Sequence, residues 1–85
     1  MSQYRVQRFI SRFEIDNELS FFEIPFTVEP SLKELQDICG FESDDPIYDE
    51  VELDDGKLER LRAFVESDFD VKRYVYFLSC VDATD

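Results

Sequence analysis

The segment from Arg73 to Val81 constrains the fold most, because its side chains are apolar on both faces of an extended chain. Successive side chains of a strand point to opposite faces of a sheet. The two sets are Tyr74, Tyr76, Leu78 and Cys80 on one face, and Val75, Phe77 and Val81 on the other. A strand of this kind is usually central in its sheet, so the segment predicts that the chain folds around a β-sheet.

Two more strands are predicted near the start of the chain. Within residues 4–13, apolar side chains alternate between two faces: Tyr4, Val6 and Ile10 on one, and Phe9 and Phe13 on the other. A second apolar run, residues 19–24, stops at Pro25. Between the runs, residues 14–17 include an Asp and an Asn, which tolerate turn geometry. The two runs therefore predict a β-hairpin.

Two helices are predicted between the hairpin and the last strand. Pro30 suits a first helical position and Gly40 a helix end. Apolar side chains recur between them at spacings of three and four, at Leu32, Leu35, Ile38 and Cys39, which predicts a helix over residues 30–39. The second helix, about residues 56–67, has Asp54 or Asp55 as its cap and an apolar stripe at Leu58, Leu61, Phe64 and Val65. Residues 41–56 are predicted to be a loop that has room for a short strand at 48–52.

These elements predict a single α+β domain over residues 1–85, since a chain of this length suffices for one hydrophobic core. The order β-β-α-α-β, with the last strand paired to the first, gives a small, mostly antiparallel sheet of order 2-1-3. The optional short strand would extend this sheet, and both helices would cover one face. The second face would carry some of Phe9, Phe13, Phe22, Val75 and Phe77, together with Arg and Gln from the first strand. Such a face can bind a partner, form a dimer or stay exposed, and these three interpretations remain open.

Composition argues against an enzyme and against a cofactor. The chain has no His, so imidazole bases, imidazole metal ligands and Ser-His or Cys-His nucleophiles are excluded. Cys39 and Cys80 form neither a CxxC pair nor a zinc ligand set, and we expect them to be reduced core thiols. With no phosphate loop and little room for a cleft, no catalytic residues are predicted. The N-terminus resembles no signal peptide and no run of 18 apolar residues is present, so a cytoplasmic location is expected.

No metal site is predicted either. A calcium loop aligned on Gly56 would place Val51 and Leu53 at ligand positions, and Arg62 where a bidentate Glu belongs. Clustered surface carboxylates are more often hydrated than bound to a specific cation. We therefore expect the acidic residues to act through their charge.

Acidic residues are concentrated in the middle of the chain. The net charge is −12, from 21 acidic and nine basic residues, and eight carboxylates fall within residues 42–55, here called the acidic segment. Such a charge disfavours nucleic acid and anionic membranes and favours a basic protein partner, with Tyr48 as an aromatic anchor. A solvated loop that serves solubility is the alternative. The candidate partner-binding residues are Glu42, Asp44, Asp45, Tyr48, Asp49, Glu50, Glu52, Asp54 and Asp55.

Two stretches of the chain carry a resemblance to a known class of proteins. They are Asp44-Asp45-Pro46-Ile47-Tyr48-Asp49 and the aromatic run Phe69 to Leu78, in a small, acidic, His-free α+β chain that opens with a predicted hairpin. In these features the chain resembles immunity proteins of bacterial contact-dependent inhibition and polymorphic toxin systems. The resemblance implies a one-to-one complex that neutralises a cognate toxin domain, commonly a basic nuclease. It implies no catalytic residues, since the inhibition is by binding.

Two other functions fit the same composition. A nucleic-acid mimic would use its carboxylates in place of phosphates to inhibit a nuclease or a CRISPR effector, and would compete with DNA or RNA. A structural homodimer would join two copies through the uncovered sheet face or a strand edge, with the acidic residues serving solubility only.

Overall fold

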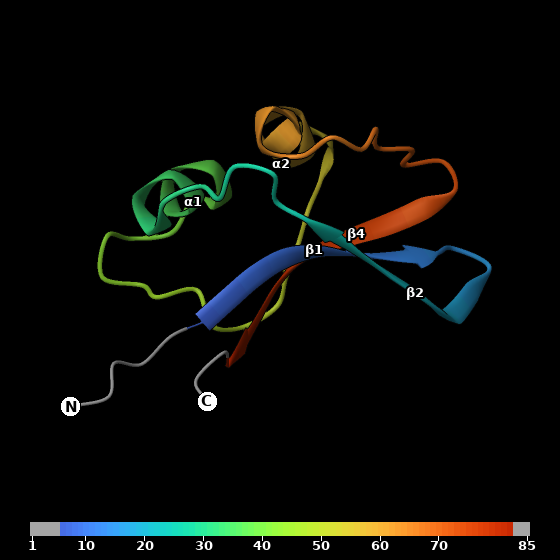
Figure 1. Ribbon diagram of the computed structural model, residues 1–85, viewed down its shortest axis with the longest axis horizontal. Helices are drawn as coiled ribbons and strands as arrows, with labels where there is room; N and C mark the ends of the chain where they lie inside the picture. The colour runs from blue at the N-terminus through green and yellow to red at the C-terminus, as the bar shows by residue number, and fades with distance from the viewer. Residues whose placement is uncertain (1–5, 83–85) are drawn as a thin grey trace.

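Four antiparallel strands form one sheet, and two helices lie together against one of its faces (Figure 1). The computed structural model describes residues 6–82. Its elements are β1 (Val6–Glu14), β2 (Asn17–Pro25), α1 (Leu32–Cys39), β3 (Val51–Glu52), α2 (Asp55–Leu61), a 3-10 turn (Arg62–Phe64) and β4 (Tyr74–Asp82). The sheet order is β2-β1-β4-β3, so the predicted α+β layout is confirmed, with the short strand added at the edge. Tyr4 of the predicted first strand lies outside the described residues.

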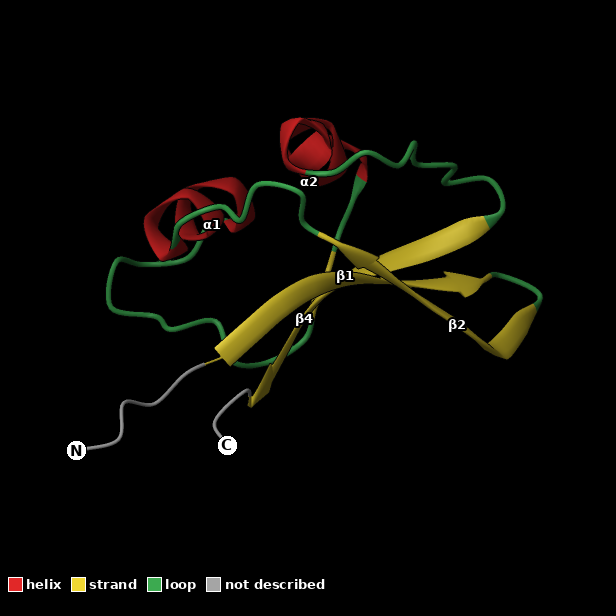
Figure 2. Ribbon diagram, in the orientation of Figure 1, coloured by secondary structure: helices red, strands yellow, loops and turns green. Residues whose placement is uncertain are grey.

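The strand register explains which side chains form the core. Ile10 of β1 lies opposite Ile24 of β2 and Leu78 of β4, and these side chains face the helices. The two helices lie over this face (Figure 2), and Leu35 from α1 and Leu61 from α2 belong to the same core. The side chains of this core with the least exposure are Ile10, Ile24, Leu35, Leu61, Tyr76 and Leu78. Burial of this apolar area is the main force that holds the helices on the sheet.

Local sequence sets where α1 begins and ends. Ser31 accepts a hydrogen bond from the Glu34 amide (3.1 Å), and the Glu34 carboxylate accepts one from the Ser31 amide (3.0 Å). This capping box starts the helix two residues later than Pro30 suggests. Gly40 ends it with φ of 79°, a left-handed conformation that glycine adopts without a steric penalty.

The second helix is shorter than the predicted range of 56–67. It ends at Leu61 and continues as a 3-10 turn, after which Val65 is extended. The carbonyl of Phe64 accepts a hydrogen bond from the Thr27 amide at 2.8 Å. Contact with the chain that follows β2 therefore replaces the next helical turn, a tertiary effect that the apolar stripe does not reveal.

The sheet face away from the helices is here called the open face, because neither helix lies on it (Figure 2); the side chain of Glu50 reaches Ser79 on this face. Its side chains include Phe9, Ser11, Phe13, Ile15, Phe21, Val75, Phe77 and Ser79. The expectation of Phe22 on this face is wrong. A bulge between Arg12 and Glu14 shifts the hairpin register, so Phe22 lies opposite Arg12 on the helix side and Phe21 takes its place.

The arginines of β1 also lie on the helix side, while Gln7 of β1 lies on the open face, as expected. The guanidinium carbon of Arg12 lies 4.5 Å from the ring centroid of Phe22 and 4.2 Å from that of Tyr74. The arginine is thus held between two aromatic rings at the hairpin end of the sheet. Arg12 consequently contributes no positive charge to the open face.

Candidate functional site

The acidic segment connects α1 to α2 and follows the edge of the sheet formed by β3 (Figure 1). The structure distributes the nine predicted site residues over three places. Glu42, Asp44, Asp45, Tyr48, Asp49 and Glu50 lie on the loop before β3, Glu52 lies in β3, and Asp54 and Asp55 begin α2. All are exposed except Asp45, which is half-buried. The carboxylates therefore form a band around the edge of the molecule, not a single flat patch.

Gln36 holds the loop part of this segment against α1. Its side chain is buried, and Nε2 donates to the carbonyl oxygens of Ser43 (3.1 Å) and Asp45 (2.7 Å). Arg8 adds a hydrogen bond from Nη2 to the carbonyl of Pro46 at 2.8 Å. Gln36 is not among the residues predicted from the sequence. The available signal was its position four residues after Leu32, on the side of the helix that faces the protein.

Ile47 anchors the same loop in the core. Its side chain is buried among the core residues, and its backbone has a positive φ of 52°. A β-branched residue rarely adopts this conformation, which costs on the order of 1–3 kcal/mol. The Asp45 carboxylate supports the turn by accepting a hydrogen bond from the Ile47 amide at 2.9 Å. Burial of Ile47 keeps its neighbours Tyr48 and Asp49 at the surface.

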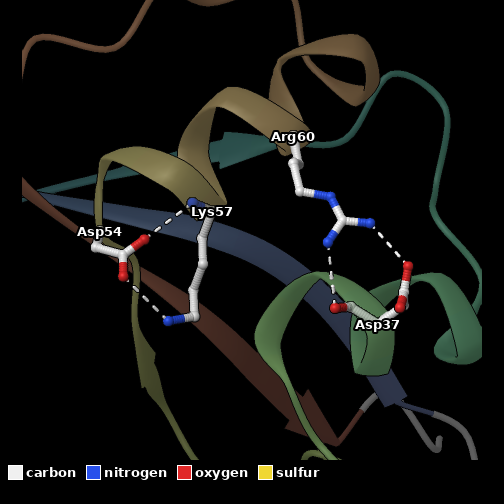
Figure 3. Close-up of polar contacts among 4 residues, drawn as sticks. All are labelled: Asp37, Asp54, Lys57 and Arg60. Atoms are coloured by element: carbon white, nitrogen blue, oxygen red, sulfur yellow. Dashed lines mark hydrogen bonds and ion pairs between the residues drawn. The ribbon is translucent and has the colours of Figure 1, made fainter.

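Nearby cations are bound to carboxylates in the helix layer (Figure 3). Lys57 pairs with Asp54 at 3.3 Å, and Arg60 pairs with Asp37 at 2.7 Å, joining α2 to α1. Across residues 6–82, no ion pair involves the remaining carboxylates of the acidic segment: Glu42, Asp44, Asp45, Asp49, Glu50, Glu52 and Asp55. No cation from residues 6–82 forms an ion pair that offsets their mutual repulsion, which solvent and dissolved ions screen.

Asp54 differs from its acidic neighbours because it caps α2. Its carboxylate accepts hydrogen bonds from the Lys57 amide (2.9 Å) and from Lys57 Nζ (3.3 Å), which lower the pKa of this group. Asp54 thus has a structural role, the capping of α2, that is independent of any partner. Asp45 also has a structural role, because its carboxylate supports the turn at Ile47.

The Asp54 cap predicts a pH dependence of stability. Because the folded pKa is lowered, the stabilisation is complete above the ordinary aspartate pKa of about 3.9 and is lost as the pH falls through the folded pKa. Asp54→Asn keeps a capping acceptor without this titration. We expect wild type to be more stable than Asp54→Asn at pH 7, with the difference shrinking below about pH 4. The midpoints of urea unfolding of both proteins, measured from pH 7 to pH 2, test this expectation. A difference in stability between the two proteins that stays constant with pH would contradict it.

The surroundings of Cys39 disfavour a reactive thiol. Burial raises the pKa of Cys39, although Lys57 and Arg60 act in the opposite direction. A raised pKa disfavours the nucleophilic thiolate at neutral pH. Cys39 packs against the core as a small apolar residue, in agreement with the sequence prediction.

Comparison with known proteins places the chain in a family. It belongs to the family described as "Domain of unknown function (DUF7683)", whose model matches residues 7–79. The match runs from β1 into β4 and contains the whole acidic segment. No curated protein and no solved structure matches the chain. No described helix has the length and apolar character needed to cross a membrane.

Proposed function

We propose that this member of the family is an immunity protein that binds a basic toxin domain in the cytoplasm and neutralises it. The observation that carries the proposal is the band of exposed carboxylates in the acidic segment. Among the described residues, only Lys57 forms an ion pair with a carboxylate of this segment, that of Asp54. A basic partner would supply the missing counter-charges. Neutralisation then requires only that the complex cover the active site of the toxin or an adjoining surface.

The loop anchors make this band suitable for binding. Gln36 holds the backbone on either side of Asp44, and the buried side chain of Ile47 holds the backbone that precedes Asp49. Less conformational freedom is therefore lost when a partner binds. Complementary charge also raises the association rate by roughly 10- to 1,000-fold and sets the relative orientation of the two proteins. Association with the toxin is therefore expected to slow as salt increases.

Charge reversal tests the proposal. The chain is co-expressed with the product of the adjacent open reading frame, and binding and growth rescue are measured. In the triple variant Asp44→Lys, Asp49→Lys, Glu52→Lys, we expect affinity to fall by well over tenfold, mainly through slower association. These three side chains have no described hydrogen bond or ion pair, so folding should be retained.

A matched control separates local charge from net charge. Glu29→Lys, Glu66→Lys, Asp68→Lys makes the same change in net charge at exposed sites that lie outside both the acidic segment and the open face of the sheet. We expect this variant to bind within about threefold of wild type, because a rim charge outside the interface affects mainly long-range steering. Equal binding by both triple variants would contradict the proposed surface. Displacement of DNA or RNA from a captured nucleic-acid-binding protein would identify a mimic instead.

A further inference from the structure

The open face carries an exposed aromatic cluster at the hairpin end of the sheet. The ring centroids of Phe13 and Phe21 are 5.4 Å apart, and those of Phe13 and Phe77 are 5.9 Å apart. Phe21 is 55% exposed and Ile15 is 48% exposed, so the cluster is only partly shielded from water. A contiguous aromatic surface of this kind is more typical of an interaction site than a single exposed apolar residue is.

A hollow of about 400 Å³ lies beside this cluster. It is lined by Phe13, Glu14, Ile15, Glu50, Val75 and Phe77. Its floor is therefore apolar, and its two charged members are carboxylates. The guanidinium of arginine and the ammonium of lysine, each on an apolar stem, match this combination because the stem can pack on the rings while the charge meets a carboxylate.

Glu50 is held at this position by a hydrogen-bonded chain across the sheet. Ser11 and Ser79 share a hydrogen bond of 2.7 Å, and Ser79 Oγ donates to Glu50 Oε2 at 3.4 Å. Both serines are buried. Glu52, opposite Phe77 in the β3–β4 register, lies on the same face. The acidic segment and the aromatic cluster thus meet along β3 and form one continuous surface.

We propose that the open face is the apolar centre of the interface whose acidic rim is described above, and that its hollow receives an arginine or lysine side chain of the basic partner protein. This inference rests on the proposed function. In this interface the aromatic cluster supplies most of the binding affinity, and the carboxylates orient the partner. The centre and the rim of protein interfaces commonly differ in this way.

Charge favours such a partner over a second copy of the chain. The charged side chains that line the hollow are Glu14 and Glu50, and Glu23 and Glu52 lie on the same face, whereas Lys72 and Arg73 lie outside the hollow, beyond Glu14 and Ile15. In a two-fold symmetric dimer, the same surface occurs on both subunits, so these carboxylates would face like charges. Like-charge contacts disfavour association, whereas a surface with lysine, arginine and apolar side chains complements the face.

Two adjacent phenylalanines provide the test variant and its control. Phe21→Ser removes a ring from the open face, and Phe22→Ser removes one of similar exposure (51%) from the opposite face. We expect Phe21→Ser to weaken binding to the co-purified toxin domain by tenfold or more, and Phe22→Ser by less than threefold. If the acidic triple variant loses binding but Phe21→Ser does not, the proposed function stands and the open-face inference fails.

Peptide probes test the inference even when no toxin domain is recovered. One decapeptide contains five arginines and five leucines, and the other has serine in place of each leucine. We expect wild type to bind the leucine peptide at least tenfold more tightly, and Phe21→Ser to remove that preference while Phe22→Ser keeps it. Equal binding of both peptides by wild type would overturn the inference. So would a concentration-dependent dimer in sedimentation that Phe21→Ser abolishes, since a second copy would then occupy the face.

Discussion

Leu61→Ala is expected to lower the free energy of unfolding by about 3 kcal/mol, within the range of 2–5 kcal/mol for buried leucines. Leu61 is fully buried where α2 meets the sheet, so truncation leaves a cavity that α2 and the strands close only in part. A domain of 85 residues has a total stability of roughly 4–13 kcal/mol. The substitution therefore removes a large share of it. Urea unfolding followed by circular dichroism measures the change in midpoint at constant slope.

Leu19→Ala is the matched control, because it makes the same chemical change at a side chain that is 93% exposed. We expect its unfolding free energy to stay within about 0.5 kcal/mol of wild type. A comparable loss of stability in both variants would show that Leu61 is not packed as described.

Gln36→Leu is expected to destabilise the protein by about 2 kcal/mol, since a lost partner typically costs 1–3 kcal/mol for a buried polar group. Leucine is apolar and similar in volume to glutamine, but it branches one carbon earlier and donates no hydrogen bond, so the carbonyls of Ser43 and Asp45 lose their shared donor. We also expect faster hydrogen exchange of the Ile47 amide, which depends on the turn that Asp45 supports. Urea unfolding and amide exchange measure the two effects.

Gln7→Leu controls for the change of glutamine to leucine, because Gln7 is exposed in β1. Its stability should remain within about 0.5 kcal/mol of wild type. Normal exchange at Ile47 in Gln36→Leu would contradict the role of Gln36 in holding the acidic segment. In that case, the band of carboxylates would depend on Ile47 and Arg8 for its position.

Most of the secondary structure follows from short-range patterns. Alternation in residues 6–13 and 74–81 identifies two strands, because only an extended chain separates these side chains onto two faces. The Pro30 and Gly40 signals bracket α1 to within two residues. Errors occur where distant groups compete for the backbone, as at Phe64, whose carbonyl bonds to Thr27 and ends the second helix early.

The candidate site was predictable in composition but not in arrangement. The eight carboxylates and Tyr48 are evident from the sequence, and all of them except the half-buried Asp45 are exposed in the structure. Their different roles are not evident. Asp54 and Asp45 serve a helix cap and a turn, while Glu50 and Glu52 border the aromatic open face.

The amino-acid sequence by itself determined the α+β class, the element order and the excess of carboxylates in residues 42–55, because these depend on residue type and near-neighbour spacing. Only the tertiary structure decided that Phe21, and not Phe22, joins Phe13 and Phe77, and that Gln36 and Ile47 anchor the acidic loop. The physical reason is that a one-residue shift in strand register reverses the face of every side chain. Register and loop anchoring depend on contacts between residues far apart in the chain.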